Sequence, residues 1–171
     1  MHCLPRWEEA VSRGCFRLRY WAAFSLTSLV WLAGVPPGIA ETNFAVLHAF
    51  RGGQDGSAPF STLIEDKAGN LFGTTSGIDS KGMGTIFKLA PDGTETVLHS
   101  FRGYPRDGEE PTAGLVMDKD GNLYGTTDWG GKFGLGAVYE YSSKGIARVL
   151  YSFQGGADGQ QPTSGLLVGR D

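Results

Sequence analysis

The chain has 171 residues, of which 40% are hydrophobic and 19% charged, and this balance is typical of one globular domain and not of a disordered chain. Four of the 15 basic residues and two of the 18 acidic residues lie in the first 40 positions, so the remainder carries a net charge of about −5. No run of Lys or Arg follows residue 41, and phosphate neutralisation requires one, so we expect no nucleic-acid partner.

The first 40 residues differ in kind from the rest of the chain. Arg13, Arg17 and Arg19 precede an apolar run over residues 20–35. Pro36 and Pro37 then break any helix, and small residues lead to Ala40. This order predicts a signal peptide over residues 1–40 and a secreted or cell-surface protein. The alternative is an uncleaved anchor, although the run is a little short for a membrane span. A start codon assigned too far upstream would also account for the long charged leader.

Both cysteines, Cys3 and Cys15, lie inside this leader. Neither follows an apolar run at the spacing of a lipid-modified cysteine. Cleavage would remove both thiols, so we expect neither a disulfide nor a thiolate metal site in the mature chain, and no cofactor.

Residues 41–171 form a tandem repeat with a period of 51–52 residues. One segment recurs as Val-Leu-His/Tyr-Ala/Ser-Phe and ends at Phe50, Phe101 and Phe153, and a Gly-rich turn that closes on Asp-Gly follows each copy. Residues 118–127 likewise repeat residues 66–75, with a Gly-Asn turn and a Leu-aromatic-Gly-Thr-Thr segment. Full repeats lie near 61–101 and 113–153, with partial repeats at both ends.

Each repeat predicts four short strands joined by turns, with no helical periodicity. Four-stranded antiparallel units of this length build β-propeller blades, so the predicted fold is all-β, with propeller-like blades that are incomplete at about two full repeats. Within the last strand, Val97, His99 and Phe101 are expected to share one face. In the Thr-Thr pairs at 74–75 and 126–127, one hydroxyl is expected to bond a neighbouring blade.

Two repeats are fewer than a closed propeller or a stable stack requires. The chain is therefore expected to be a fragment of a longer propeller, a subunit of an assembly, or marginally stable alone. Unpaired strand edges at both ends predict self-association.

The repeated motifs resemble the GloVer (Gloeo-Verruco) tandem repeat of bacterial choice-of-anchor proteins. The resemblance covers residues 44–168 and rests on Asp-x-x-Gly-Asn-Leu-Tyr-Gly-Thr-Thr, then Gly-Thr-Ile-Phe-Lys-Leu and Val-Leu-His-Ser-Phe. It implies a secreted or surface-displayed bacterial protein, often with a C-terminal sorting anchor, and no established activity or catalytic residues. Ala137-Val138-Tyr139 departs from the Gly-Thr-Val/Ile-Phe form of the repeat, a change that should leave the fold intact.

The most suggestive metal motif is Asp118-x-Asp120-x-Asn122, which has the first three ligand positions of a calcium loop. Ala68 replaces the second carboxylate in the first copy, and the loop lacks both Gly at its sixth position and Glu at its twelfth. We interpret the stretch as a hairpin turn that sets the register of each blade, and we expect no metal site.

Two further polar sets recur with the repeat. The aspartates before glycine are Asp55, Asp107 and Asp158. They could converge on one rim of a propeller, but Asp before Gly is also the ordinary turn choice, and we interpret them as turns. His48 and His99 stand where the third copy has Tyr151, and a metal ligand or general base would not exchange with tyrosine. Aromatic packing or hydrogen bonding is therefore predicted for them.

Tyr104, Trp129 and Phe133 lie in predicted loops where the repeat requires no aromatic residue. Such residues stack on sugar rings or anchor a protein partner, or else fold back on their own sheet. The chain has no nucleophile elbow, no HExxH pair and no phosphate-cradling loop, so we expect no catalytic residues. The predicted function is a binding or structural module for an unknown protein or carbohydrate ligand. The alternative is a propeller scaffold for an extracellular polysaccharide hydrolase or lyase.

Overall fold

The computed structural model describes residues 44–77 and 82–169, and the predicted signal peptide lies outside this part of the chain. The described residues are all-β, as predicted, and their only helical turns are the 3-10 turns η2 (Gly53–Asp55) and η3 (Gly156–Asp158). Within this described part, no helix is long and apolar enough to cross a membrane.

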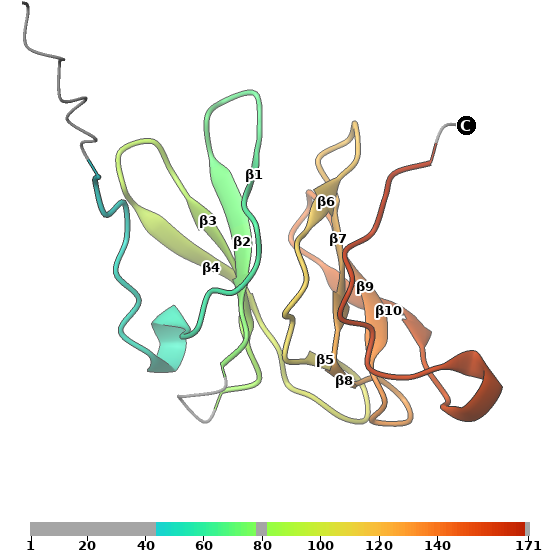
Figure 1. Cartoon of the computed structure of the whole chain (residues 1–171). Helices are drawn as coiled ribbons and strands as arrows, with labels where there is room; N and C mark the ends of the chain where they lie inside the picture. The colour runs from blue at the N-terminus through green and yellow to red at the C-terminus, as the bar shows by residue number, and fades with distance from the viewer. Residues whose placement is uncertain (1–43, 78–81, 170–171) are drawn as a thin grey trace, which may run out of the picture. The chain divides into compact units, whose positions relative to one another are not determined.

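Each full repeat folds into one four-stranded antiparallel sheet (Figure 1). Sheet 1 has the order β1 (Ile64–Glu65), β2 (Leu71–Thr75), β3 (Thr85–Leu89) and β4 (Glu95–Ser100). Sheet 2 has the order β6 (Val116–Met117), β7 (Leu123–Thr127), β9 (Ala137–Tyr141) and β10 (Ala147–Ser152). A separate two-stranded ribbon pairs β5 (Gly108–Glu109) with β8 (Trp129–Gly130). Neither four-stranded sheet closes on itself, and the prediction of four strands per repeat is confirmed.

The Gly-Asn turn sets the register of the first hairpin in each sheet. The carboxylate of Asp118 accepts hydrogen bonds from the backbone N–H groups of Asp120 and Asn122 and from the Asn122 side chain, at 2.9, 2.9 and 2.8 Å. Gly121 takes φ = 80°, a conformation that glycine adopts without strain. Asp66 makes the same three contacts in sheet 1. The turn interpretation of this stretch is therefore confirmed.

These hydrogen bonds predict a pH dependence of stability. The Asn122 side chain is the largest contributor to lowering the pKa of Asp118 from 3.8 to about 2. A carboxyl whose pKa is lower in the folded chain stabilises it above the unfolded pKa, and this stabilisation is lost as the pH falls from about 4 towards 2. Asp118→Asn should lower the Tm at pH 7, and the difference from the wild type should shrink on acidification. Thermal melts between pH 2 and 7 measure this, and a difference that stays constant over that range would contradict it.

The predicted common face of Val97, His99 and Phe101 is wrong, because a β-bulge interrupts β4. Val97 pairs with Phe87, whereas His99 pairs with the neighbouring Ile86. Paired residues share a face and adjacent strand residues do not, so Val97 and His99 lie on opposite faces. β10 is bulged at the equivalent place, between its residues 149 and 151. The bulge recurs and is therefore part of the repeat.

The repeat also predicts a strand over residues 46–50, the first copy of the segment that ends in Phe, but these residues have no regular secondary structure. In the full repeats, the equivalent segments β4 and β10 pair with β3 and β9 respectively. No strand precedes this segment among the described residues, so its backbone has no ladder to join.

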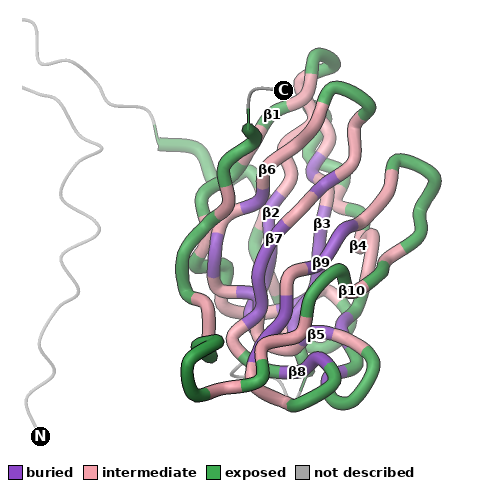
Figure 2. The backbone as a smooth tube through the Cα atoms, turned by 90° about the vertical axis from the view of Figure 1, so that its right-hand side faces the viewer, coloured by how far each residue is buried: buried purple, intermediate pink, exposed green. Residues whose placement is uncertain are grey.

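The core lies along the central strands, where Figure 2 shows the buried backbone on β2, β3, β7 and β9. The buried cluster consists of Ile86, Phe101, Leu115, Leu123 and Tyr139. Because these residues come from both sheets and from the segment between them, sheet 1 and the second repeat share one core. Polar turns occupy the exposed ends of the strands.

Consecutive repeats are joined by the same contacts. The Thr74 hydroxyl lies 3.0 Å from the backbone oxygen of Pro111 and 3.5 Å from that of Ala113, and the Thr126 hydroxyl donates at 3.0 Å to the backbone oxygen of Ser164, the counterpart of Ala113. One hydroxyl of each Thr pair thus bonds the next repeat, as predicted. The backbone N–H groups of Glu110 and Gln161 likewise donate to the backbone oxygens of the equivalent residues 83 and 135, each at 2.9 Å. The hydrogen bonds that join sheet 1 to the second repeat therefore recur between sheet 2 and the segment that follows it.

Candidate functional site

The recurring aspartates and polar aromatic residues form one pair in every copy. The pairs are His48–Asp55 at 3.1 Å, His99–Asp107 at 3.0 Å, and Tyr151–Asp158. In each pair the ring donates to a carboxylate that also accepts a nearby backbone N–H group, which closes the turn. Each ring also packs edge-on against the phenylalanine two residues further on. Both predictions are confirmed: the aspartates belong to turns, and the histidines pack and form hydrogen bonds.

In the second and third pairs, the surroundings of the aspartate favour its ionised form. Burial alone would raise the pKa of Asp107, but the hydrogen bond and charge of His99, together with backbone N–H groups, bring it below the usual value. The Tyr151 hydroxyl has the largest part in lowering the pKa of Asp158. Charged carboxylates are the better acceptors, so at neutral pH these turns hold their hydrogen bonds firmly.

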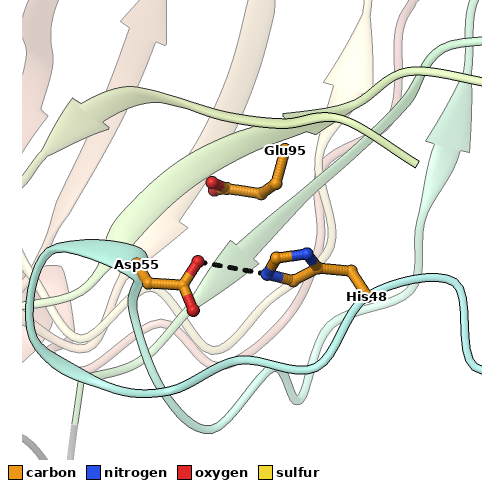
Figure 3. Close-up of side chains that lie close together, drawn as sticks. All are labelled: His48, Asp55 and Glu95. Atoms are coloured by element: carbon orange, nitrogen blue, oxygen red, sulfur yellow. Dashed lines mark hydrogen bonds and ion pairs between the residues drawn. The ribbon is translucent and has the colours of Figure 1, made fainter. Parts of the chain in front are cut away.

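Glu95 adds a third polar group to the first pair. This residue begins β4, and its carboxylate faces His48 and Asp55, which come from the preceding turn (Figure 3). One ligand atom from each of the three side chains lies within 4.8 Å of the others. The Glu95 Oε1 atom is buried and has no hydrogen-bond partner among the described residues. Burial, and then the charge of Asp55, raise the pKa of Glu95.

Sequence reasoning missed Glu95 because this residue does not recur. The same position at the start of β10 holds Ala147, so comparison of the repeats gives no signal there. Without the glutamate, the second pair lines an open cleft of about 610 Å³, with Tyr104 and Ala147 also on its walls. The two repeats thus present the same His–Asp pair, once with a third acid and once without it.

Tyr104 and Phe133 lie on two loops that the β5–β8 ribbon joins, whereas Trp129, predicted to lie in a loop, is the first residue of β8. Trp129 pairs with Glu109 in the ribbon, and a Cβ atom at Gly134, next to Phe133, would lie 3.6 Å from the Tyr104 ring. Tyr104 is 64% exposed, Trp129 40% and Phe133 43%. The ammonium group of Lys132 lies 5.3 Å from the centre of the Phe133 ring. The structure therefore brings the segments of all three predicted residues together, with much of each ring exposed to solvent.

The comparison with known proteins agrees with this repeated architecture. No curated protein is significantly similar in sequence to the chain. Residues 37–171 match the model of the Gloeobacter/Verrucomicrobia repeat, and this range contains both sheets and all three Asp turns. The resemblance read from the Gly-Asn and Leu-aromatic-Gly-Thr-Thr motifs is confirmed, and the chain belongs to the Gloeobacter/Verrucomicrobia repeat family.

Proposed function

We propose that the chain is a non-enzymatic binding or structural module of a secreted or surface-displayed bacterial protein, built from propeller-like blades. The copied contacts after sheet 1 and sheet 2 support this arrangement, because a propeller packs each blade on the next in one way. The structural role that we propose is self-association through the sheets. Leu63 in the first repeat is 46% exposed whereas its counterpart Leu115 is 3% exposed, which leaves an apolar surface of sheet 1 for another blade.

The observation that carries the binding role is the joining of two aromatic loops by the β5–β8 ribbon. A ring exposed on a backbone-paired loop is held in place before a ligand arrives, so little conformational entropy is lost on binding. Aromatic faces stack on the apolar faces of sugar rings and also anchor protein partners. Tyr104, Trp129 and Phe133 are therefore the proposed contact residues for a carbohydrate or protein ligand.

Replacing Trp129 or Tyr104 by alanine is expected to weaken carbohydrate binding at least tenfold, since an aromatic residue at the centre of an interface contributes about 2 kcal/mol or more. Retardation in native gels that contain soluble polysaccharides measures the affinity. Phe60→Ala is the matched control, because Phe60 is 68% exposed and lies outside the two loops. Equal retardation of all three variants and the wild type would contradict the proposed contact residues.

The alternative of a polysaccharide hydrolase or lyase has one observation in its favour. Asp55 and Glu95 are two neighbouring carboxylates, and the pKa of Glu95 is raised, as a general acid requires. However, Asp55 already accepts hydrogen bonds from His48 and from the backbone of Arg51. The binding proposal therefore stands first. New reducing ends in the same polysaccharides, lost on Glu95→Gln, would favour the enzyme instead.

A further inference from the structure

We propose that His48, Asp55 and Glu95 bind a divalent transition-metal ion, with Zn²⁺ the ion that matches them best. This site is independent of the proposed ligand-binding loops, because none of its residues belongs to them. The ion would join the turn of one repeat to the first residue of β4 in the next.

The geometry of the pair fits two ligands of one ion. His48 Nε2 and Asp55 Oδ1 are 3.1 Å apart. Zinc bonds of about 2.0–2.2 Å to nitrogen and oxygen place neighbouring ligand atoms about 3.0–3.5 Å apart. One ligand atom of Glu95 lies within 4.8 Å of a ligand atom of each of the other two side chains, a gap that rotation of a flexible side chain closes. On binding, the imidazole takes the tautomer that carries its proton on Nδ1, so that the lone pair of Nε2 coordinates the metal in place of the hydrogen bond to Asp55.

The two carboxylates of the site favour a bound cation. Asp55 and Glu95 are neighbouring acids, and no lysine or arginine forms a salt bridge with either one among residues 44–77 and 82–169. The Glu95 carboxylate faces this region (Figure 3), and its buried Oε1 atom has no hydrogen-bond partner among the described residues. A buried carboxylate without a partner is costly, and a bound metal ion would satisfy it.

The donor set selects the kind of metal. One imidazole nitrogen and two carboxylate oxygens suit Zn²⁺ and its neighbours in the first transition row, and three protein ligands leave coordination positions for water. Ca²⁺ requires six to eight oxygen ligands, so this site should bind it poorly. The His48 and Asp55 side chains are 22% and 23% exposed, which gives an ion a path from solvent.

The repeats supply matched control variants. Glu95→Ala installs the residue of the second copy, Ala147, and His48→Tyr installs that of the third copy, Tyr151. Tyr151 keeps the hydrogen bond to its turn aspartate, so His48→Tyr should fold normally while it loses the metal-binding nitrogen. Conversely, Ala147→Glu places a carboxylate beside His99 and Asp107, which line the same cleft as Ala147.

The test is calorimetric titration of ZnCl₂ into the full chain, with Cys3 and Cys15 replaced by serine in every variant to remove the thiols. The parent should bind one equivalent, Glu95→Ala and His48→Tyr should each bind at least tenfold more weakly, and Ala147→Glu should bind two equivalents. Circular dichroism of the metal-free proteins checks that each variant folds. Zn²⁺ should also raise the Tm of the parent but not that of Glu95→Ala.

Three outcomes would overturn the site. The first is parent affinity retained by folded Glu95→Ala and His48→Tyr variants, because zinc would then bind elsewhere. The second is the absence of a heat signal and of a Tm shift in the parent at millimolar Zn²⁺. The third is stronger binding of Ca²⁺ than of Zn²⁺, which would contradict the role assigned to the imidazole.

Discussion

Replacing Gly84 by alanine should destabilise the chain by about 2–5 kcal/mol, because two costs add at this position. Gly84 has φ = 94°, which side-chain-bearing residues rarely adopt. A Cβ atom there would lie 2.4 Å from Pro111 Cδ and 2.5 Å from the backbone oxygen of Thr75. A single domain is stable by about 5–15 kcal/mol, so the loss is a large part of the total.

Urea denaturation followed by circular dichroism measures the loss. Gly93→Ala is the matched control, because Gly93 has φ = 85° but its added Cβ would meet only the Leu47 oxygen, at 3.7 Å. The difference between the two variants separates the steric cost of the contacts with Pro111 and Thr75 from the cost of the positive φ. Gly136→Ala should resemble Gly84→Ala, since its Cβ would lie 2.5 Å from Pro162 Cδ. Equal losses of stability in Gly84→Ala and Gly93→Ala would show that the atoms of Pro111 and Thr75 move aside at little cost.

Local chemistry made much of this fold predictable from sequence. An Asp-x-x-Gly-Asn turn has few ways to close, so the role of Asp118 followed from the residue types alone. The exchange of His99 for Tyr151 between copies pointed to a shared hydrogen bond, which the structure contains. Features that recur and act over a few residues leave a clear signal when the copies are aligned.

Features that depend on distant partners left no such signal. The bulge between Val97 and His99 adds one residue to β4 without any change in composition, so alternation alone placed the side chains on the wrong faces. The segment Val46–Phe50 has the sequence of a strand, but the state of such a segment depends on a pairing partner. Glu95 meets His48 across almost one full repeat and is not repeated, so the cluster emerged only in three dimensions.

The clearest departure from the repeat pattern inside the core is Tyr139, and Tyr139→Phe is expected to stabilise the chain by about 1–2 kcal/mol. Tyr139 is 1% exposed, and its hydroxyl has no hydrogen-bond partner among the described residues. Burial raises the pKa of this phenol, so the group stays neutral and gains nothing from charge. The first repeat has Phe87 at the same place, which shows that a bare ring fits this core.

Urea denaturation of Tyr139→Phe and of the reverse variant, Phe87→Tyr, checks this explanation. In Phe87→Tyr the new hydroxyl would point at Gly73, because a Cβ atom there would lie 2.8 Å from Phe87 Cζ. That variant should lose stability, since it buries a hydroxyl for which the first repeat offers no new partner. A loss of stability in Tyr139→Phe would mean that the hydroxyl has a partner in solution, such as a buried water molecule, and that the second repeat depends on this hydrogen bond.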